Sequence, residues 1–175
     1  GLPYELYEKH GIRKYGFHGT SCSYVASRAT ELAGQELSQS KVVICHLGNG
    51  VTVAAVQNGR SVDTSMGLTP LEGAMMGTRC GDLDPGVVLY LQRELNLSRE
   101  QVEGMLNHDS GLLGISGHSN DMRQIIALAH QGDERCKLAL EMYTYRLKKY
   151  IGAYAAAMGG IDLVAFAGGI GENAP

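Results

Sequence analysis

The sequence of 175 residues is 44% hydrophobic and 19% charged, which is the balance of one globular domain with its own core. The formal net charge of −3 argues against nucleic-acid binding, and no apolar run is long enough to cross a bilayer. Four widely spaced cysteines indicate free thiols in the cytoplasm, and six histidines without HxH or HExxH spacing argue against a structural zinc site.

The first third of the chain predicts two helices followed by three antiparallel strands. Pro3 begins a short helix that ends near Gly11, because proline fits a first helical turn. We expect an extended piece at 14–17, a helix at 21–33, and strands at 41–45, 51–57 and 60–64. Asn58-Gly59 joins the last two strands as a tight turn, since both positions tolerate positive φ.

The rest of the chain predicts an ordered loop, four helices and a late strand. The loop covers 65–81, and Asp84-Pro85 starts a helix whose apolar face is Val87, Val88, Leu91 and Leu95. We expect further helices at 98–106, with Ser98 as its cap, at 121–130 and at 133–158. We also expect a glycine-punctuated loop at 110–117 and an apolar strand at 161–167 in the centre of the sheet. Together these elements predict a single α/β domain with a mixed sheet flanked by helices.

Two predicted strands run into glycine-rich turns. The first strand leads into His46, Leu47, Gly48, Asn49 and Gly50, and the last leads into Gly168, Gly169, Ile170, Gly171, Glu172 and Asn173. Glycines at a strand end let backbone N–H groups converge on an anion, although a tight turn between strands explains either one alone. No Walker A loop is present, but residues 169–174 match the G-x-G-x-x-A fingerprint, which leaves an NAD-dependent oxidoreductase as an alternative.

Arg79 and His18 are the candidate groups for chemistry on an anion. Arg79 is flanked by small residues and its planar fork suits phosphoryl or carboxylate oxygens; alternatively, it pairs with Asp82 or Asp84 to fix its loop. His18 precedes a helix and can donate to a reacting oxygen; alternatively, it packs against Tyr15 or Phe17.

Two other patterns have plain structural explanations. Asp121 precedes a helix and is expected to cap it, which leaves Arg123 solvated one turn in. His10, His108 and His130 are expected on the surface, and His118 is not assigned. An apolar seam in the longest helix predicts either core or a dimer face; its members are Cys136, Leu140, Tyr143, Leu147, Tyr150 and Tyr154.

Taken together, six strings resemble the acetokinase family, the kinases of acetate, propionate and butyrate. They are YGFHGTS (15–21), HLGNG (46–50), SVDTSMGLTPLEGAMMGTRCGDLDPG (61–86), SGLLGISG (110–117), DMR (121–123) and GGIGEN (168–173). The strings occur in order and cover nearly the whole chain, which makes the resemblance specific.

The resemblance implies a ribonuclease H-like fold of the actin, sugar-kinase and Hsp70 superfamily, in which two α/β domains hold ATP. Residues 1–175 would be most of the C-terminal, nucleotide-binding domain, without the N-terminal domain and the C-terminal end. It implies that residues 46–50 contact the phosphates and that His18 and Arg79 stabilise the transferring phosphoryl group. The nucleoside side is assigned to Asp121, Met122 and Arg123 together with Gly169, Ile170, Gly171, Glu172 and Asn173.

The implied reaction is reversible phosphorylation of acetate by ATP with Mg²⁺, whose protein ligands lie outside this chain. The implied assembly is a cytoplasmic homodimer that pairs through this domain. Propionate or butyrate kinase is the nearest alternative, and a non-catalytic nucleotide-binding domain is a third. The chain departs from the family at Cys22, where a histidine is usual, next to the string that holds His18.

Overall fold

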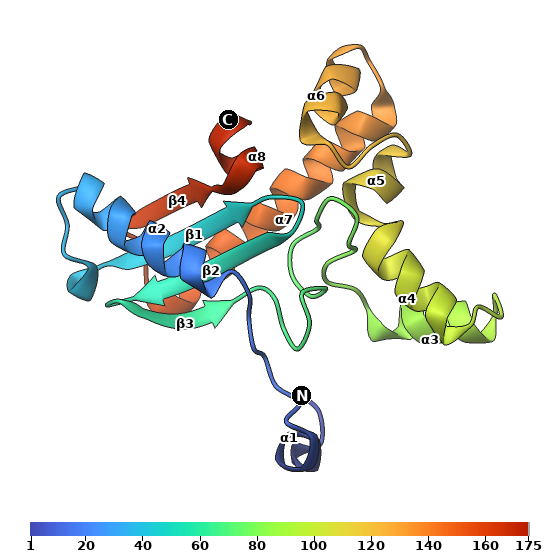
Figure 1. The fold of residues 1–175 in the computed structure, drawn as a ribbon, viewed down its shortest axis with the longest axis horizontal. Helices are drawn as coiled ribbons and strands as arrows, with labels where there is room; N and C mark the ends of the chain where they lie inside the picture. Colours follow the sequence, from blue (N-terminus) through green and yellow to red (C-terminus); the bar gives the residue numbers. More distant parts are fainter. Residues whose placement is uncertain (175) are drawn as a thin grey trace.

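The central strands carry apolar side chains on both of their faces, so helices can cover the sheet on both sides. The computed structural model describes residues 1–174. Its sheet has the order β3-β2-β1-β4, with β1, β2 and β3 antiparallel and β4 parallel to β1 (Figure 1). The strands are β1 (Lys41–Leu47), β2 (Val51–Gln57), β3 (Arg60–Thr64) and β4 (Leu163–Ala167).

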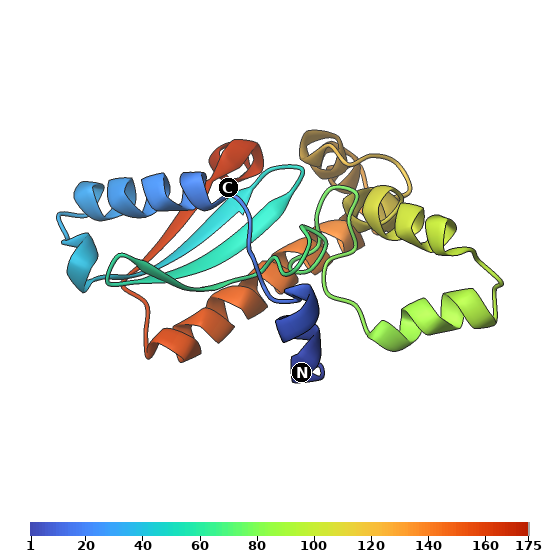
Figure 2. The same cartoon turned by 60° about the horizontal axis from the view of Figure 1, so that its bottom comes forward.

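Helices α2 and α7 lie on opposite faces of this sheet, α8 packs against β1 and β4, and α3 to α6 gather beyond one end of the sheet (Figures 1 and 2). In chain order the helices are α1 (Tyr4–His10), α2 (Gly19–Leu32), the 3₁₀ turn η1 (Leu37–Gln39), α3 (Pro85–Arg93), α4 (Arg99–His108), α5 (Gly111–Ser116), α6 (Met122–His130), α7 (Glu134–Met158) and α8 (Gly168–Asn173). Within the described part of the chain, none of these helices has the length and apolar character needed to span a membrane.

The core has two parts, one on each side of the sheet. Val42 and Ile44 of β1 pack toward α2 in the smaller part, whereas Val43 and Cys45 pack toward α6 and α7 in the larger part. Burial in the larger part raises the pKa of the Cys45 thiol to about 12, so this group stays a neutral core residue. The period of two along β1 therefore fixes which side chains face each helix layer.

The local predictions that rest on turn and cap chemistry are confirmed. Asn58 and Gly59 both have positive φ, at 52° and 77°. Asp84 and Asp121 cap α3 and α6, and Ser98 forms a capping box with Gln101 at α4. The loop at 65–81 is ordered and its methionines are buried in the larger core. These signals are reliable because each depends on neighbouring residues only.

The apolar seam of α7 is confirmed as core and not as an exposed face. Cys136, Tyr143, Leu147 and Tyr154 are buried, and Leu140 and Tyr150 pack against the same cluster. His10, His108 and His130 are exposed, as predicted. All four cysteines carry free thiols, which also agrees with the prediction.

Two predicted segments take a different form. The loop predicted at 110–117 contains the short helix α5, with Gly111 at φ 62° at its start and Gly117 at φ 73° as its C-cap. A Cβ on Gly111 would strike the Met76 carbonyl, so glycine serves close packing there. The extended piece predicted at 14–17 is interrupted at Gly16, which has φ 74°, and the amides of Tyr15 and Gly16 both donate to the Gly67 carbonyl.

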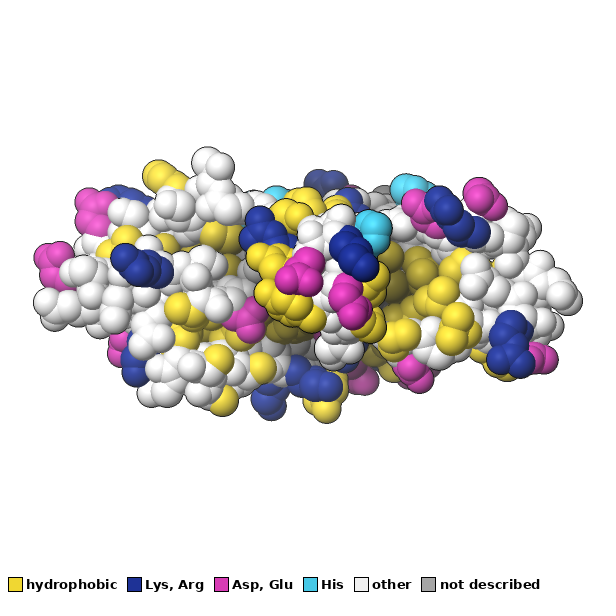
Figure 3. Space-filling view, turned by 90° about the horizontal axis from the view of Figure 1, so that it is seen from below, with side chains coloured by type: hydrophobic (Ala, Val, Ile, Leu, Met, Phe, Trp, Pro, Cys, Tyr) yellow, Lys and Arg dark blue, Asp and Glu magenta, His cyan; other side chains and the backbone are white. Residues whose placement is uncertain are grey.

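Two apolar patterns were assigned to the wrong surroundings. β4 was expected in the centre of the sheet, but it is an edge strand of the described sheet, and Phe166 is 53% exposed. The predicted apolar face of α3 is covered only in part, since Val88 and Leu91 are half-buried and Val87 is 38% exposed. Leu95, the last residue of the predicted face, lies beyond the end of α3 and is exposed. Figure 3 shows hydrophobic side chains around a hollow on the face seen from below. Apolar composition alone does not reveal which neighbour covers an element.

Replacing Gly168 with alanine should destabilise the fold. Gly168 has φ 79°, and a Cβ added there would lie 2.7 Å from the Leu47 carbonyl oxygen. We expect Gly168→Ala to lower the free energy of unfolding by about 2 kcal/mol or more, measured by urea denaturation. Gly169→Ala is the matched control, because a Cβ at Gly169 meets nothing within 4 Å. Equal effects of the two substitutions would contradict the close approach.

Candidate functional site

Three of the sequence strings meet at one cavity of about 720 Å³. The parallel register that pairs His46 with Ala167 sets the glycine turn after β1 beside the turn after β4. The start of α6 closes the third side. The lining residues are Gly48, Asn49, Asn120, Asp121, Met122, Arg123, Ile126, Gly169, Ile170, Asn173 and Ala174.

The α8 wall contains three of the five residues predicted there. Gly169, Ile170 and Asn173 line the cavity. The side-chain Nδ2 of Asn173 donates to the Gly169 carbonyl at 2.9 Å. Gly171 instead lies close to the β4 backbone at Phe166, and Glu172 is exposed away from the cavity lining. The glycine motif was expected to be a turn, but its residues form the short helix α8.

At the α6 wall, Asp121 and Arg123 hold each other. Asp121 Oδ1 caps the helix by accepting from the Arg123 amide at 2.9 Å. Its carboxylate also accepts from Arg123 Nε and Nη2, at 3.1 and 2.7 Å, and this pairing holds the pKa of Asp121 below its ordinary value. Arg123 is exposed as predicted, and Asp121 orients its guanidinium.

The first glycine turn is tied to α6 by a side-chain hydrogen bond. Asn120 Nδ2 donates to Asn49 Oδ1 at 2.8 Å, and the Asn49 carbonyl accepts from the Gly77 amide at 3.0 Å. Of the five predicted residues in HLGNG, Gly48 and Asn49 line the cavity. Leu47 is buried in the larger core because β1 extends through it, which the predicted end at Cys45 missed.

His18, His46 and Arg79 lie near Gly50, the last residue of this turn. These four residues are called the Gly50 corner below. A Cβ at Gly50 would lie 3.2 Å from Arg79 Nη1 and 3.6 Å from His18 Cε1. His18 precedes α2 with φ 58°, and its ring stacks on the His46 ring at 4.4 Å between centroids. The alternative in which His18 packs against Tyr15 or Phe17 is therefore wrong.

Arg79 has no carboxylate partner among residues 1–174. Its Nη1 donates to the Pro70 carbonyl at 3.2 Å. Asp82 instead accepts from the Tyr150 hydroxyl at 2.7 Å, and Asp84 caps α3. The alternative in which Arg79 pairs with Asp82 or Asp84 is therefore wrong, and its positive charge is available to an anion beside Gly50.

Two hydroxyl groups complete this corner and were missed from the sequence. Thr52 Oγ1 lies 2.8 Å from His18 Nδ1, and Ser21 Oγ lies 2.9 Å from His46 Nδ1. His46 and Thr52 are register partners across β1 and β2, so their side chains share one face. Serine three residues after His18 was a visible signal, whereas Thr52 was identified only by strand pairing.

The corner keeps His18 neutral. Burial lowers the pKa of His18, and the neighbouring His46 and Arg79 lower it further. A neutral imidazole still donates one N–H, which suits an anion that already has a guanidinium beside it.

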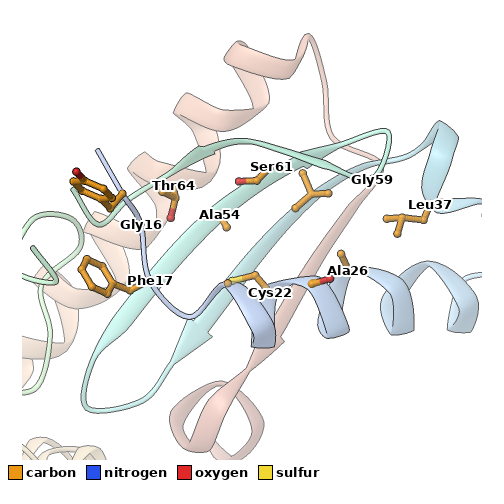
Figure 4. Close-up of a pocket in the computed structure, with 13 residues that line it drawn as sticks. Gly16, Phe17, Cys22, Ala26, Leu37, Ala54, Gly59, Ser61 and Thr64 are labelled. Atoms are coloured by element: carbon orange, nitrogen blue, oxygen red, sulfur yellow. The ribbon is translucent and has the colours of Figure 1, made fainter. Parts of the chain in front are cut away.

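A second cavity, of about 380 Å³, lies between α2 and the strands β2 and β3 (Figure 4). Phe17 lies at one end and Leu37 at the other, and Cys22 and Ala26 belong to α2 (Figure 4). Cys22 packs with Ala54 and Ile44 in the smaller core, where burial raises the pKa of its thiol. The ring of His18 is held by Thr52 and His46, so the unusual residue at position 22 does not supply its polar partner.

His118, which the sequence left unassigned, is exposed and lies outside the cavity lining. Its Nε2 lies 3.0 Å from the Asp133 carboxylate, which also caps α7. His118, Asp133 and Cys136 place ligand-type atoms within 4.8 Å of one another. Because both Asp133 oxygens already have hydrogen-bond partners, these contacts are explained by the helix cap and the loop.

Comparison with known proteins agrees with this geometry, since the sequence model of the Acetokinase family matches residues 1–175. The chain belongs to the acetokinase family. It is 58% identical over 173 residues to acetate kinase from Halothermothrix orenii, a match that covers 99% of this chain and 44% of that enzyme.

Solved acetokinase structures share the fold. The crystal structure of Porphyromonas gingivalis acetate kinase has a TM-score of 0.97 at 50% identity and covers 99% of this chain. A propionate kinase from Francisella tularensis gives a TM-score of 0.94 at 48% identity, also over 99% of this chain. The match covers 43% and 44% of those two chains, so this chain spans less than half the length of these relatives. The fold is that of the actin, sugar-kinase and Hsp70 superfamily, as the six strings implied.

His18 should titrate below its ordinary pKa of 6.5, because burial, His46 and Arg79 all disfavour the imidazolium. As pH falls below 6.5, the unfolded chain binds a proton at His18 before the folded chain does. The free energy of unfolding therefore decreases as pH falls from 6.5 to the lowered pKa of the folded state. The measurement is an NMR titration of the His18 ring. His46→Gln removes one cause and should raise the pKa of His18 toward 6.5. A wild-type midpoint at or above 6.5 would contradict the corner described above.

Proposed function

We propose that these residues form the nucleotide-binding half of a two-domain kinase that transfers the γ-phosphoryl group of ATP reversibly to acetate. The observation that supports this most directly is the corner at Gly50. There, an arginine that has no carboxylate partner within the described residues and a neutral histidine lie beside a glycine turn that also lines a cavity of about 720 Å³. Cavities of about 300–1,000 Å³ are the ordinary size for small ligands.

The lining of the cavity offers two kinds of chemistry. Ile126, Ile170 and Met122 supply apolar surface suited to a base, and Asn120 and Asn173 supply polar groups suited to a ribose. Gly48 and Asn49 lead from there to the corner, so the phosphates would extend along residues 46–50 toward His18 and Arg79. Gly171, Glu172 and Leu47 would support these walls without lining them.

The proposed mechanism is positioning and charge stabilisation. Phosphoryl transfer spreads negative charge over three equatorial oxygens, so fixed donors accelerate it without covalent chemistry. Arg79 would present its planar fork, and His18 would donate one N–H from a neutral ring. The pair adds a single positive charge, which limits repulsion within the corner.

The family implies Mg²⁺ with ATP, and the residues described here do not build a site for it. Asp121 is the one carboxylate in the described lining of the cavity, and Arg123 already occupies both of its oxygens. Mg²⁺ prefers free oxygen ligands in an octahedral arrangement. We therefore propose that its protein ligands come from residues outside this chain.

The acceptor and the assembly are also part of the proposal. Acetate is favoured because the curated relative at 58% identity is an acetate kinase, and propionate is the second candidate because a propionate kinase has a TM-score of 0.94. A hydrophobic pocket separates one methylene by only about 1–3 kcal/mol, so turnover of acetate, propionate and butyrate by the complete protein decides between them. We further propose a cytoplasmic homodimer that pairs through this domain, which sedimentation at several concentrations tests.

Arg79→Ala in the complete protein should reduce turnover far more than nucleotide affinity. Loss of a preorganised donor to a developing charge typically costs about 10²–10³ in kcat. The measurement is kcat from a coupled assay together with nucleotide Kd from calorimetry. Arg93→Ala, on the exposed α3, is the control and should change neither quantity. Equal losses in kcat and affinity for Arg79→Ala would count against the assignment.

The isolated chain of 175 residues should bind ATP or ADP in preference to NADH. The reason is that residues 48–174 supply walls for the cavity, whereas the proposed acceptor site needs the other domain. Calorimetric titration with the three nucleotides measures this preference. The same sample should show no acetate kinase turnover, and preferential binding of NADH would favour the oxidoreductase alternative.

A further inference from the structure

The fully buried hydroxyl of Thr52 has one hydrogen-bond partner among residues 1–174, and that partner is His18 Nδ1 at 2.8 Å. A hydroxyl carries a single hydrogen, and a buried hydroxyl hydrogen without an acceptor is costly. No other acceptor for it is found in the described chain, so the hydroxyl donates to Nδ1. The neutral His18 ring must then carry its proton on Nε2.

His46 repeats this arrangement one strand away. Ser21 Oγ lies 2.9 Å from His46 Nδ1, and within the described residues it too has no second partner. The two rings stack at 4.4 Å with an interplanar angle of 28°, so two hydroxyl–imidazole pairs lie side by side. Ser21 is half-buried, so a water molecule can take the place of its hydroxyl as a partner of His46. Thr52 is fully buried, so water does not reach its hydroxyl.

We propose that Thr52 is a positioning residue that fixes His18 in its Nε2–H tautomer. His18 Cε1 and Arg79 Nη1 lie 3.6 and 3.2 Å from the position that a Cβ on Gly50 would occupy. Cε1 is bonded to both ring nitrogens, and because Thr52 holds Nδ1, Nε2 is the nitrogen left to donate on this side. With the proton on Nε2 the ring is a donor to an anion, and with the proton on Nδ1 it would offer a lone pair that repels the same anion. The consequence for catalysis rests on the proposed function, whereas the tautomer itself does not.

The tautomer can be tested without activity, by long-range ¹H–¹⁵N correlation spectra of the histidine rings above pH 7. His18→Gln identifies the His18 signals by their loss. We expect a protonated Nε2 and an unprotonated Nδ1 in the wild-type chain, and a mixture of both tautomers in Thr52→Val. Thr52→Ser keeps the hydroxyl and should keep the wild-type pattern.

A proton on Nδ1 in the wild type would overturn the proposal, and so would an unchanged pattern in Thr52→Val. The wild-type spectrum can refute the proposal by itself, so the test does not depend on whether Thr52→Val folds.

Kinetics of the complete protein give the second readout. Removing a group that orients a functional histidine typically costs about 10–100-fold, so Thr52→Val should lower kcat by about tenfold or more. The nucleotide KM should stay within about twofold, since Thr52 does not line the cavity. Thr52→Ser should recover most of kcat. Thr144→Val, which makes the same change on the exposed face of α7, is the control.

The two hypotheses fail in different ways. A wild-type kcat in Thr52→Val would overturn the positioning role while leaving the kinase proposal intact. A complete protein that phosphorylates no carboxylate, but whose His18 holds the Nε2–H tautomer, would overturn the kinase proposal alone.

Discussion

The arrangement of the site depends on the parallel pairing of β1 with β4. This pairing places Ala167 opposite His46 and brings the Gly168 backbone against the Leu47 carbonyl. Only a residue without Cβ permits that approach at φ 79°. As a result, two glycine-rich segments that are far apart in the chain lie side by side where β1 and β4 end, and the start of α6 completes a cavity that neither segment could form alone.

Charge is distributed unevenly around this cavity. At one side Asp121 and Arg123 neutralise each other, whereas at the Gly50 corner Arg79 has no carboxylate partner in the described chain. The neighbouring histidines are held by hydroxyls, and His18 is kept neutral by burial, by His46 and by Arg79. The corner therefore has one fixed positive charge and a neutral donor, a combination suited to an anion that gains charge as it reacts.

Predictions from the sequence succeeded where the responsible interactions are local. Asp84, Ser98 and Asp121 were found as caps because each bonds within its own first turn, and Asn58-Gly59 was found because the turn depends on two residues. They failed for α5 and β4. In α5 the glycines mark close packing and helix ends instead of a loop, and the position of β4 in the sheet depends on which strands lie beside it.

The sequence by itself determined the family, the order of most elements and the residues that could act on an anion, because motif identity and local periodicity are written along the chain. Only the tertiary structure decided that Arg79 has no carboxylate partner among residues 1–174, that His18 stacks on His46, and that Thr52 bonds His18. It also excluded Leu47, Gly171 and Glu172 from the cavity lining. Each of these facts depends on contacts between residues far apart in the chain, and strand register sets many of those contacts.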